Sequence, residues 1–437
     1  MNLIFRRFVY IFFIIIFLLA APVTVLYTMG YRYNFSVGRV QKTGLMKITS
    51  VPKNADIFLN GIKYEKSKTP AKIEYLLPGD YEIKISKEGY HDWQKKLAVY
   101  ENGTTFAEKI ILWKNNQPEK IEATTTAWST SPDGNKIALG QNNIIKILNI
   151  NSGLLGEIEG GDIIQSTELP KGSKINKILF SSNSKKILID STLSNKKQYW
   201  IYSLDFQKLL QLPTNFSGFK FNQKDNELYG YNNSGIFLIS SKGVATKQIL
   251  RANDLKDFLF DFDLIYLVNG KTLDIFDIKK NNRSNIEEFS CTTCRLEKII
   301  SSKLFVFDDT NKKMNIIDLT RKKKTLSFEA KNIDVLSDNL IMFYNDWEIF
   351  IYDFNKESPE LITRIGEPIL AACWHPKGKH LFFSTKNKIK VIELDNRELR
   401  NIIDVSEGKN YSALRFDRAG NILYSNSDNG VEKLKLK

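Results

Sequence analysis

Short segments in which apolar and polar residues alternate cover most of the chain, and one of them sets the pattern for the rest. Residues 128–139, WSTSPDGNKIAL, read as a strand, a tight turn and a second strand, because period-two alternation is typical of strands with one buried face. Weaker copies of this unit begin near residues 178, 219, 258, 299, 333, 373 and 414. The copies lie about forty residues apart, the length of a four-stranded propeller blade.

These copies predict a mainly β protein with a β-propeller over residues 124–437. A repeat of this size cannot bury its own apolar face, whereas a ring of packed repeats can. Eight copies align, so we expect eight blades; seven is the alternative, since the units near Lys303 and Asn339 have no clear turn signature. Residues 114–123, KNNQPEKIEA, form either a linker or the outer strand that closes the last blade.

The N-terminus carries a long apolar run that differs from every other segment. After a short tail, residues 1–7, which contains Arg6 and Arg7, the twenty-two residues 8–29 contain no charge. As a helix they would span about 33 Å, enough to cross a bilayer. The positive flank and the large body that follows predict a single-pass signal-anchor in the cell membrane, with a cytoplasmic N-terminus and an extracytoplasmic body. A cleaved signal peptide is the alternative.

A second β-rich region lies at residues 44–113, after a connector at residues 30–43. Its short strands are separated by turns, and the residues expected to shape them are Asn60, Gly61, Pro78, Gly79 and Gly89. The pair Asn60–Gly61 is the strongest hairpin signal, because both residues tolerate positive φ. The pattern predicts a small β-sandwich.

Gly44–Trp113 resembles a PEGA domain, a small β-sandwich of bacterial and archaeal surface proteins. The resemblance rests on SVPKNADIFLNG at 50–61, TP at 69–70, LPGDYEIKI at 77–85 and KEGY at 87–90. The tetrapeptide that names the family is PKNA here, at 52–55, so only its ends are kept. The resemblance implies a surface-exposed, non-catalytic module, and it brings no ligand-binding residues with it.

Two turns of the repeated region resemble those of WD40-like and TolB-type propeller repeats. They are SPDG at 131–134 and HPKG at 375–378. Regular Trp-Asp and Gly-His signatures are absent from the sequence, so the resemblance implies the propeller fold without a WD40 repeat proper. We interpret their turn-forming residues as structural, because Pro and Gly fit the φ angles of turns; they are Pro132, Asp133, Gly134, Pro376 and Gly378.

Composition and charge add little to this picture. Of 437 residues, 42% are hydrophobic and 12% aromatic, as expected of a globular chain. The net charge of +14 would fit an anionic partner, but lysines occur in nearly every turn and the densest run is only Arg321–Lys324. A basic surface composition explains this spread, so we expect no nucleic-acid partner.

Residues with chemical potential are few. The three cysteines include Cys291 and Cys294, spaced CxxC, which form either a local disulfide or part of a plain loop. Only three histidines are present, so we expect no metal site and no cofactor. The sequence contains no GxSxG, P-loop or Rossmann motif. The aspartates near strand ends read as solvated turn residues; they are Asp133, Asp261, Asp263, Asp308 and Asp309.

No catalytic residue is therefore predicted, and we expect a protein that is not an enzyme. The anchor and two β-modules indicate a membrane-anchored extracytoplasmic binding or scaffold protein of the cell envelope, presenting a propeller face to a protein or glycan partner. The alternative is an envelope hydrolase or lyase acting on polysaccharide or peptide at the propeller mouth. Two or three carboxylates gathered in the central channel would favour the enzyme, whereas an apolar or Lys-lined channel would count against it.

Overall fold

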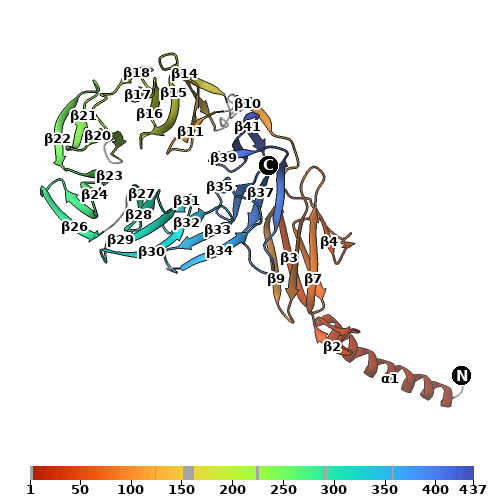
Figure 1. The fold of residues 1–437 in the computed structure, drawn as a ribbon. Coiled ribbons are helices and arrows are strands. Elements are labelled where there is room, and N and C mark those ends of the chain that lie inside the picture. The colour runs from red at the N-terminus through yellow and green to blue at the C-terminus, as the bar shows by residue number, and fades with distance from the viewer. Residues whose placement is uncertain (1–2, 124, 151–161, 223–225, 289–292, 357) are drawn as a thin grey trace. The chain divides into compact units, whose positions relative to one another are not determined.

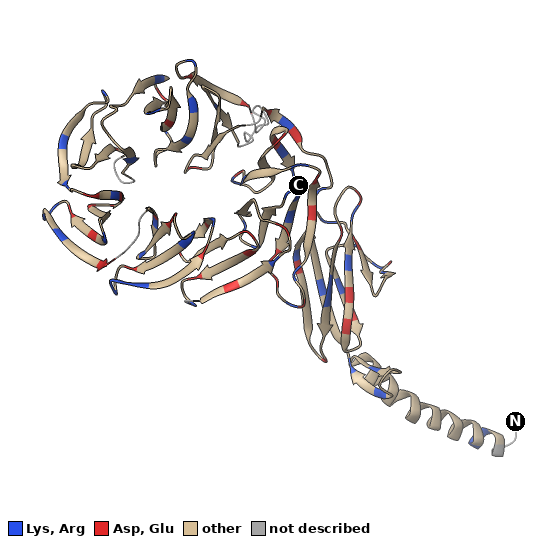
Figure 2. Ribbon diagram, viewed as in Figure 1, with Lys and Arg blue, Asp and Glu red and all other residues tan. Residues whose placement is uncertain are grey.

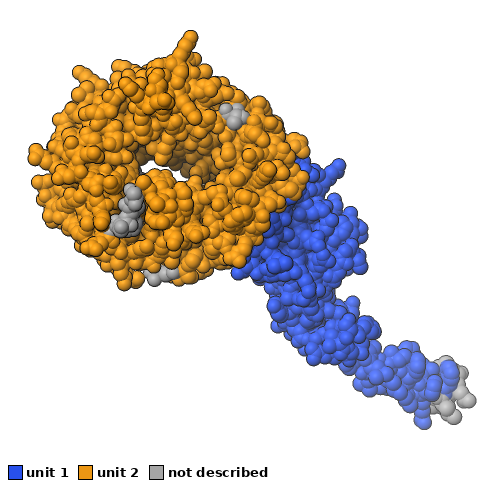
Figure 3. Space-filling view, in the orientation of Figure 1, with its two compact units in different colours: residues 1–116, 392–405, 437 blue, residues 117–391, 406–436 orange. Residues whose placement is uncertain are grey.

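The computed structural model describes residues 3–123, 125–150, 162–222, 226–288, 293–356 and 358–437. They fall into two compact units, shown in separate colours in Figure 3. Unit 1 contains residues 1–116, 392–405 and 437, and unit 2 contains residues 117–391 and 406–436. Lys and Arg are spread over both units (Figure 2), as expected from their spread along the sequence.

The N-terminal helix of unit 1, α1, spans Leu3–Thr28 (Figure 1). It begins before the predicted start at Phe8, because Arg6 and Arg7 continue the helix ahead of the apolar run. Its part from Phe5 to Thr28 has a mean hydropathy of 2.8 and no buried residues, so it is long and apolar enough to cross a membrane.

The segment expected to be a connector, residues 30–43, contains a β-hairpin that its sequence pattern did not predict. Strand β1 (Tyr31–Asn34) pairs antiparallel with β2 (Arg39–Lys42). The turn between them is stabilised by Asn34, whose side-chain oxygen accepts the N–H of Ser36 at 3.0 Å, and by Gly38 at φ +66°. In this hairpin the apolar Tyr33 and Val40 are exposed, whereas the polar Asn34 and Gln41 are buried. This is the reverse of the usual strand pattern, so the sequence pattern did not predict the two strands.

A two-sheet β-sandwich follows, which confirms the fold expected for this region. One sheet has the order β6 (Ala71–Leu76), β3 (Gly44–Val51), β9 (Thr104–Ile111), and the other β5 (Ile62–Lys63), β4 (Asp56–Leu59), β7 (Gly79–Ser86), β8 (Trp93–Val99). Alternate residues of β3 are buried, and Met46, Ile48, Ile57 and Ile83 are fully enclosed in the core. Asn60 and Gly61 both have positive φ, at 49° and 78°, as a tight hairpin requires.

Unit 1 also contains residues 392–405, which the sequence gave no reason to place beside the sandwich. The N–H of Lys96 donates to the Glu398 carboxylate at 2.7 Å, and the Asn401 amide donates to the carbonyl of Gln94 at 2.6 Å. These side chains satisfy backbone groups on the free edge of β8. The segment therefore protects an edge strand that would otherwise be open to strand pairing.

Unit 2 is a β-propeller, as predicted, and its described residues form eight four-stranded blades (Figure 1). From the inner strand outward, blade 1 is β11 (Ala127–Thr130), β12 (Lys136–Gln141), β13 (Ile144–Asn149), β14 (Ile163–Glu168); blade 2 is β15 (Lys174–Phe180), β16 (Lys186–Leu193), β17 (Lys196–Ser203), β18 (Lys208–Gln211); and blade 3 is β19 (Gly218–Phe221), β20 (Leu228–Asn232), β21 (Gly235–Ile239), β22 (Ala245–Arg251). Blade 4 is β23 (Leu255–Asp261), β24 (Leu264–Asn269), β25 (Thr272–Asp277), β26 (Asn282–Glu288); blade 5 is β27 (Cys294–Ile300), β28 (Lys303–Asp308), β29 (Lys313–Asp318), β30 (Lys323–Glu329); and blade 6 is β31 (Asn332–Ser337), β32 (Leu340–Tyr344), β33 (Glu348–Asp353), β34 (Ser358–Arg364). Blade 7 is β35 (Ala371–Trp374), β36 (His380–Ser384), β37 (Lys388–Glu393), β38 (Ile402–Glu407), and blade 8 is β39 (Tyr411–Phe416), β40 (Ile422–Ser427), β41 (Gly430–Lys435), β10 (Glu119–Glu122).

Blade 8 is built from both ends of this region of the chain. Strand β10 pairs with β41, with Glu119 opposite Lys433. Apolar residues of blades 1 and 8 then share one core cluster, which includes Ile137, Leu139, Tyr424 and Val431. Pairing between distant segments closes the ring and leaves these two blades without an exposed seam.

Blades 5 and 6, whose sequence units have no clear turn signature, have four strands each. Their outermost strands, β30 and β34, are mostly exposed. An outer strand packs on one neighbour only, so it needs few apolar residues, and its sequence resembles that of a polar loop.

Candidate functional site

An opening passes through the centre of unit 2 in the space-filling view of Figure 3. One cavity of about 290 Å³ is lined by residues at the start of three inner strands: Gly218 and Cys294, the first residues of β19 and β27, and Lys256, the second residue of β23. These strands therefore begin at the same face of the ring, which we call the entry face. Residues of β15, β16, β17 and β20 complete the lining, so the cavity draws on blades 2 to 5.

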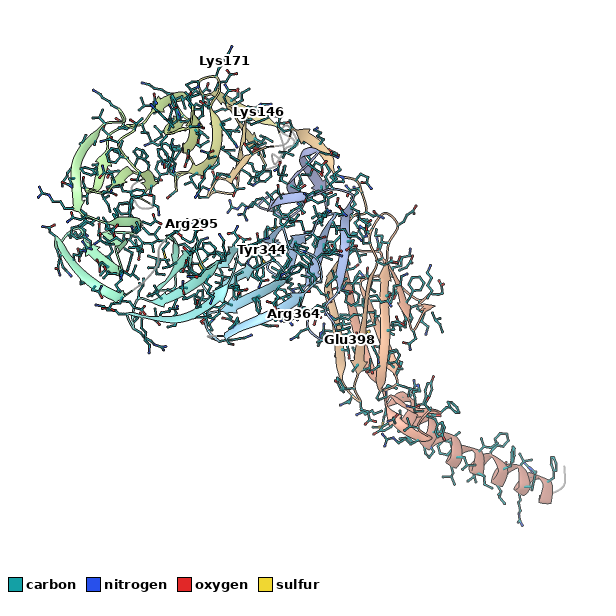
Figure 4. The ribbon with its side chains drawn as sticks, viewed as in Figure 1. Lys146, Lys171, Arg295, Tyr344, Arg364 and Glu398 are labelled. Atoms are coloured by element: carbon teal, nitrogen blue, oxygen red, sulfur yellow. The ribbon has the colours of Figure 1, made fainter. Side chains whose placement is uncertain are left out.

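Charged and aromatic side chains surround this cavity. The cations are Lys177, Lys197, Lys220, Lys256 and Arg295, and the carboxylates are Asp190, Asp257 and Glu297. Arg295 lies on the inner side of the ring (Figure 4). Tyr199, Phe219 and Tyr231 supply apolar wall, and the rings of Tyr199 and Phe219 meet edge-to-face at 5.0 Å. The five cations outnumber the three carboxylates.

Asp257 is the most deeply buried of these carboxylates, with 5% of its surface exposed. It stands on β23 of blade 4 and accepts from both sides. The Lys220 ammonium, on β19, lies 2.5 Å from one carboxylate oxygen, and the N–H of Leu296, on β27, donates to the other at 2.8 Å. One carboxylate thus ties together the inner strands of three consecutive blades.

Asp334 repeats this arrangement in blades 6 to 8. It stands on β31 of blade 6, accepts the N–H of Trp374 on β35 at 3.0 Å, and pairs with Arg415 on β39 at 3.4 Å. In both cases a carboxylate on one inner strand accepts a backbone N–H of the next inner strand. Asp257 and Asp334 therefore act as blade-to-blade links.

The remaining carboxylates of the cavity are also engaged. Asp190 pairs with Lys197 at 3.2 Å, and Glu297 pairs with Arg295 at 2.8 Å. Burial raises the pKa of the Tyr199 hydroxyl, although the nearby Lys197 opposes this. Lys298, on the same strand as Arg295, has its pKa lowered by burial, against the opposing effect of Asp334.

This geometry bears on the choice between binding and catalysis. General acid–base or nucleophilic work needs a carboxylate that can reach substrate, with a pKa matched to the task. Asp257 and Asp334 instead accept hydrogen bonds from protein donors, while Lys220, Lys298 and Arg415 add positive charge beside them. Within the described part of the chain, no group of three or more His, Cys, Asp or Glu side chains could hold a metal ion.

The SPDG turn between β11 and β12 is held by its own side chains. Gly134, at φ +70°, donates its N–H to Ser131 at 2.9 Å, and Asn135 donates to the Asp133 carboxylate at 3.0 Å. Partial burial raises the pKa of Asp133, but the hydrogen bonds from Ser131 and Asn135 outweigh it, so the net pKa is lowered. The Asp133 N–H also donates to the Ser184 hydroxyl of blade 2 at 3.2 Å. This aspartate stabilises the turn.

The structure does not bring the other predicted aspartates together. Asp261 ends the inner strand β23, and Asp308 ends the second strand β28, so they stand at opposite faces of the ring. Asp263 pairs with Lys279 at 2.7 Å and Asp309 with Arg295 at 2.9 Å. Asp308 was expected to be solvated but is only 7% exposed, because it accepts the N–H groups of the turn that follows β28.

The histidines and cysteines have structural surroundings. His375, in the HPKG turn, and His380 are both buried, and the His375 ring lies 3.0 Å from the carbonyl of Gly420. Gly378 has a φ of +68°, as the HPKG turn requires. Cys373 is a buried free thiol. Cys294 is disulfide-bonded, and Cys291 lies outside the described residues, so the pairing of these two stays a prediction.

The other predicted turn residues lie in unit 1. Pro78 immediately precedes β7, and Gly79 begins that strand at a φ of +148°. Gly89 has a φ of +79° in the turn before β8. None of these positions lines the entry-face cavity.

The fold and site define a class of protein: a β-propeller with a small β-sandwich and an apolar N-terminal helix. Comparison with known proteins agrees with this class. Residues 43–111 match the PEGA domain, which confirms the resemblance seen in the sequence. Among solved structures, the crystal structure of the C-terminal WD40 domain of Sif2 is similar to this chain, with a TM-score of 0.54 and 12% sequence identity. The alignment covers 74% of this chain and 99% of the Sif2 domain.

At this identity the likeness shows the propeller fold alone. No curated protein matches the chain. Both folds support a binding or scaffold role in general, and the particular ligand has to be argued from the site itself.

Sequence reasoning missed the residues that shape this cavity. Asp257 and Lys220 lie within strands that were correctly anticipated, but neither was singled out. The available signal is a charge inside an apolar run, as in Asp257-Phe258-Leu259-Phe260. A buried charge is costly unless it is paired, so such a position predicts a partner but does not identify it.

Proposed function

We propose that this protein is a membrane-anchored, extracytoplasmic binding or scaffold protein of the cell envelope, and that its propeller binds an anionic protein segment or glycan at the entry-face cavity. The helix α1 supports the anchor, since it is uncharged from Phe8 to Thr28 and none of these residues is buried. The PEGA match supports an extracytoplasmic body, because the family resemblance implies surface exposure. The positive flank at Arg6 and Arg7 favours a cytoplasmic N-terminus.

The observation that carries the ligand class is the charge balance of the cavity. Asp190, Asp257 and Glu297 each have a protein partner, whereas Lys177 on β15 has no ion-pair partner in the described part of the chain. An anionic ligand would gain from the excess of cations without having to displace a carboxylate. The exposed Leu179 and the ring of Tyr199 offer apolar contact beside these charges.

The test compares full-length protein with a charge variant, Lys177→Gln/Lys197→Gln/Lys256→Gln, in pull-downs from solubilised native envelopes and in binding to purified envelope glycan. A matched control, Lys208→Gln/Lys247→Gln/Lys322→Gln, removes the same charge from exposed positions outside the cavity. We expect the cavity variant to lose its partner and the control to keep it, with binding that weakens as salt is raised.

Equal binding by both variants would refute the site. Turnover of a glycan or peptide by the purified protein would refute the binding function in favour of an enzyme. Protease treatment of intact cells tests the location, because a body that stays protected while the cells remain sealed contradicts an extracytoplasmic position.

A further inference from the structure

The β1–β2 hairpin, residues 31–42, exposes its apolar side chains. Tyr33 and Val40 are directly opposite each other across the two strands and are 49% and 54% exposed. The turn adds Phe35, 89% exposed, and Val37, 55% exposed. The rings of Tyr33 and Phe35 meet edge-to-face at 4.9 Å, so these side chains form one continuous apolar surface.

The other side of the same hairpin is polar and buried. Asn34 and Gln41 are each 6% exposed, and the Asn34 amide donates to the Gln41 side-chain oxygen at 2.7 Å. The Gln41 amide then donates to Glu101, beyond β8, at 3.2 Å. A hairpin that faces water normally buries its apolar side and exposes its polar side. This hairpin does the reverse, and hydrogen bonds hold it that way.

The hairpin is also tied to the end of α1. The N–H and hydroxyl of Thr43 both donate to the carbonyl of Gly30, at 2.9 and 2.7 Å. The Arg32 guanidinium donates to the carbonyl of Tyr27 at 2.6 Å and lies 3.4 Å from the centroid of its ring. The apolar surface is therefore fixed at the level where the helix ends.

The charge of this segment is of one sign. Residues 30–43 contain Arg32, Arg39 and Lys42 and no Asp or Glu. Aromatic rings together with cations are the composition found where protein meets lipid headgroups, because the rings enter the interface and the cations contact phosphate.

We propose that the β1–β2 hairpin docks on the lipid surface, inserting Phe35, Val37, Tyr33 and Val40 into the interfacial region of the bilayer that α1 crosses. Arg39 and Lys42 contact the anionic headgroups. The inference rests on α1 as a membrane anchor, which belongs to the proposed function. It gives the protein a second membrane contact that holds the base of the sandwich against the bilayer.

The test places an environment-sensitive fluorophore at single introduced cysteines in the full-length protein: Phe35→Cys in the hairpin, Ile62→Cys as the control and Leu18→Cys in α1. Ile62 is 76% exposed in a different hairpin of the same unit, and the native Cys373 is buried. Each protein is reconstituted into vesicles of phosphatidylcholine and phosphatidylglycerol that contain a lipid with a nitroxide quencher just below the headgroup, or one deep in the acyl chain.

We expect the shallow quencher to reduce the Phe35→Cys signal about three times as strongly as the Ile62→Cys signal, since only an inserted side chain reaches that depth. The variant Arg39→Gln/Lys42→Gln should weaken this difference in vesicles that contain phosphatidylglycerol. Equal quenching at Phe35 and Ile62, with deep quenching at Leu18, would overturn the hairpin proposal and leave the anchor intact. No deep quenching at Leu18 would overturn the anchor and the hairpin proposal together.

Discussion

Replacing Asp257 by alanine should destabilise the propeller more than any single change to a surface ion pair. The substitution removes a 5% exposed carboxylate that accepts from Lys220 at 2.5 Å and from the N–H of Leu296 at 2.8 Å. Removing one partner of a buried pair typically costs about 3–5 kcal/mol. Because 26% of the Lys220 side chain is exposed, water can solvate the remaining ammonium, and we expect about 3 kcal/mol, the lower end of that range.

The assay is thermal unfolding of the full-length protein in detergent micelles, followed by tryptophan fluorescence. A loss of about 3 kcal/mol should lower the unfolding midpoint of a unit of this size by about 6 °C. The variant Asp257→Asn keeps an acceptor for the Leu296 N–H but leaves the Lys220 charge unpaired, so its midpoint should fall by roughly half as much.

Two further variants make the reasoning refutable. In Asp257→Ala/Lys220→Met the unpaired ammonium is gone, so the double variant should be less destabilised than the two single changes added together. The control Asp263→Ala removes a partly exposed ion pair with Lys279 and should shift the midpoint by less than about 1 °C. If Asp257→Ala and Asp263→Ala give the same shift, or if the single changes simply add, the blade-to-blade link is not what stabilises this side of the ring.

Three other predictions follow from buried positions. Gly235→Ala should destabilise blade 3 strongly, because Gly235 has a φ of +138° and an added Cβ would lie 1.9 Å from the carbonyl oxygen of Leu250. The control Gly366→Ala should change the thermal midpoint little, because its added Cβ would meet no atom within 4 Å. Burial raises the pKa of Tyr266 to about 12, so the folded protein holds this proton more tightly than the unfolded chain. The stability that the protonated Tyr266 contributes is complete below the ordinary tyrosine pKa, near 10, and should be lost as the pH rises from about 10 to about 12. Denaturation midpoints across this pH range measure the loss, and the variant Tyr266→Phe, which cannot titrate, is the control. Cys373 should resist a maleimide in the native state and react in urea, since it is buried and burial raises the pKa of its thiol; rapid modification of the native protein would contradict this position in the core.

Much of the architecture was predictable because it depends on local alternation. Strands such as β7 and β12 bury alternate or nearly all apolar positions, and the turns before them carry Pro-Gly and Pro-Asp-Gly. Outer strands such as β30 were not predictable in the same way, since they contact one neighbour and need no apolar face. The β1–β2 hairpin was missed because its polar residues point inward.

The candidate site was less predictable than the fold. Lys220, Asp257 and Leu296 stand on three different strands, and nothing within the sequence of one strand indicates the other two. The folded ring places the acidic residues differently from what their positions in the chain suggest. The aspartates at strand ends, such as Asp261 and Asp308, are separated to opposite faces, whereas Asp257, inside a strand, meets its partners.

The sequence by itself determined the order of the parts: an apolar helix, a small sandwich with its turn residues, and a repeated β-unit that must close into a ring to bury its apolar faces. These features depend on residues close together in the chain, where periodicity and turn chemistry act directly. Tertiary structure decided which charges meet. The pairing of β10 with β41, the cover that residues 392–405 give to the edge of β8, and the Lys220–Asp257–Leu296 link all join distant segments. Such contacts form because buried polar groups must find partners, and the fold alone determines which partners lie within reach.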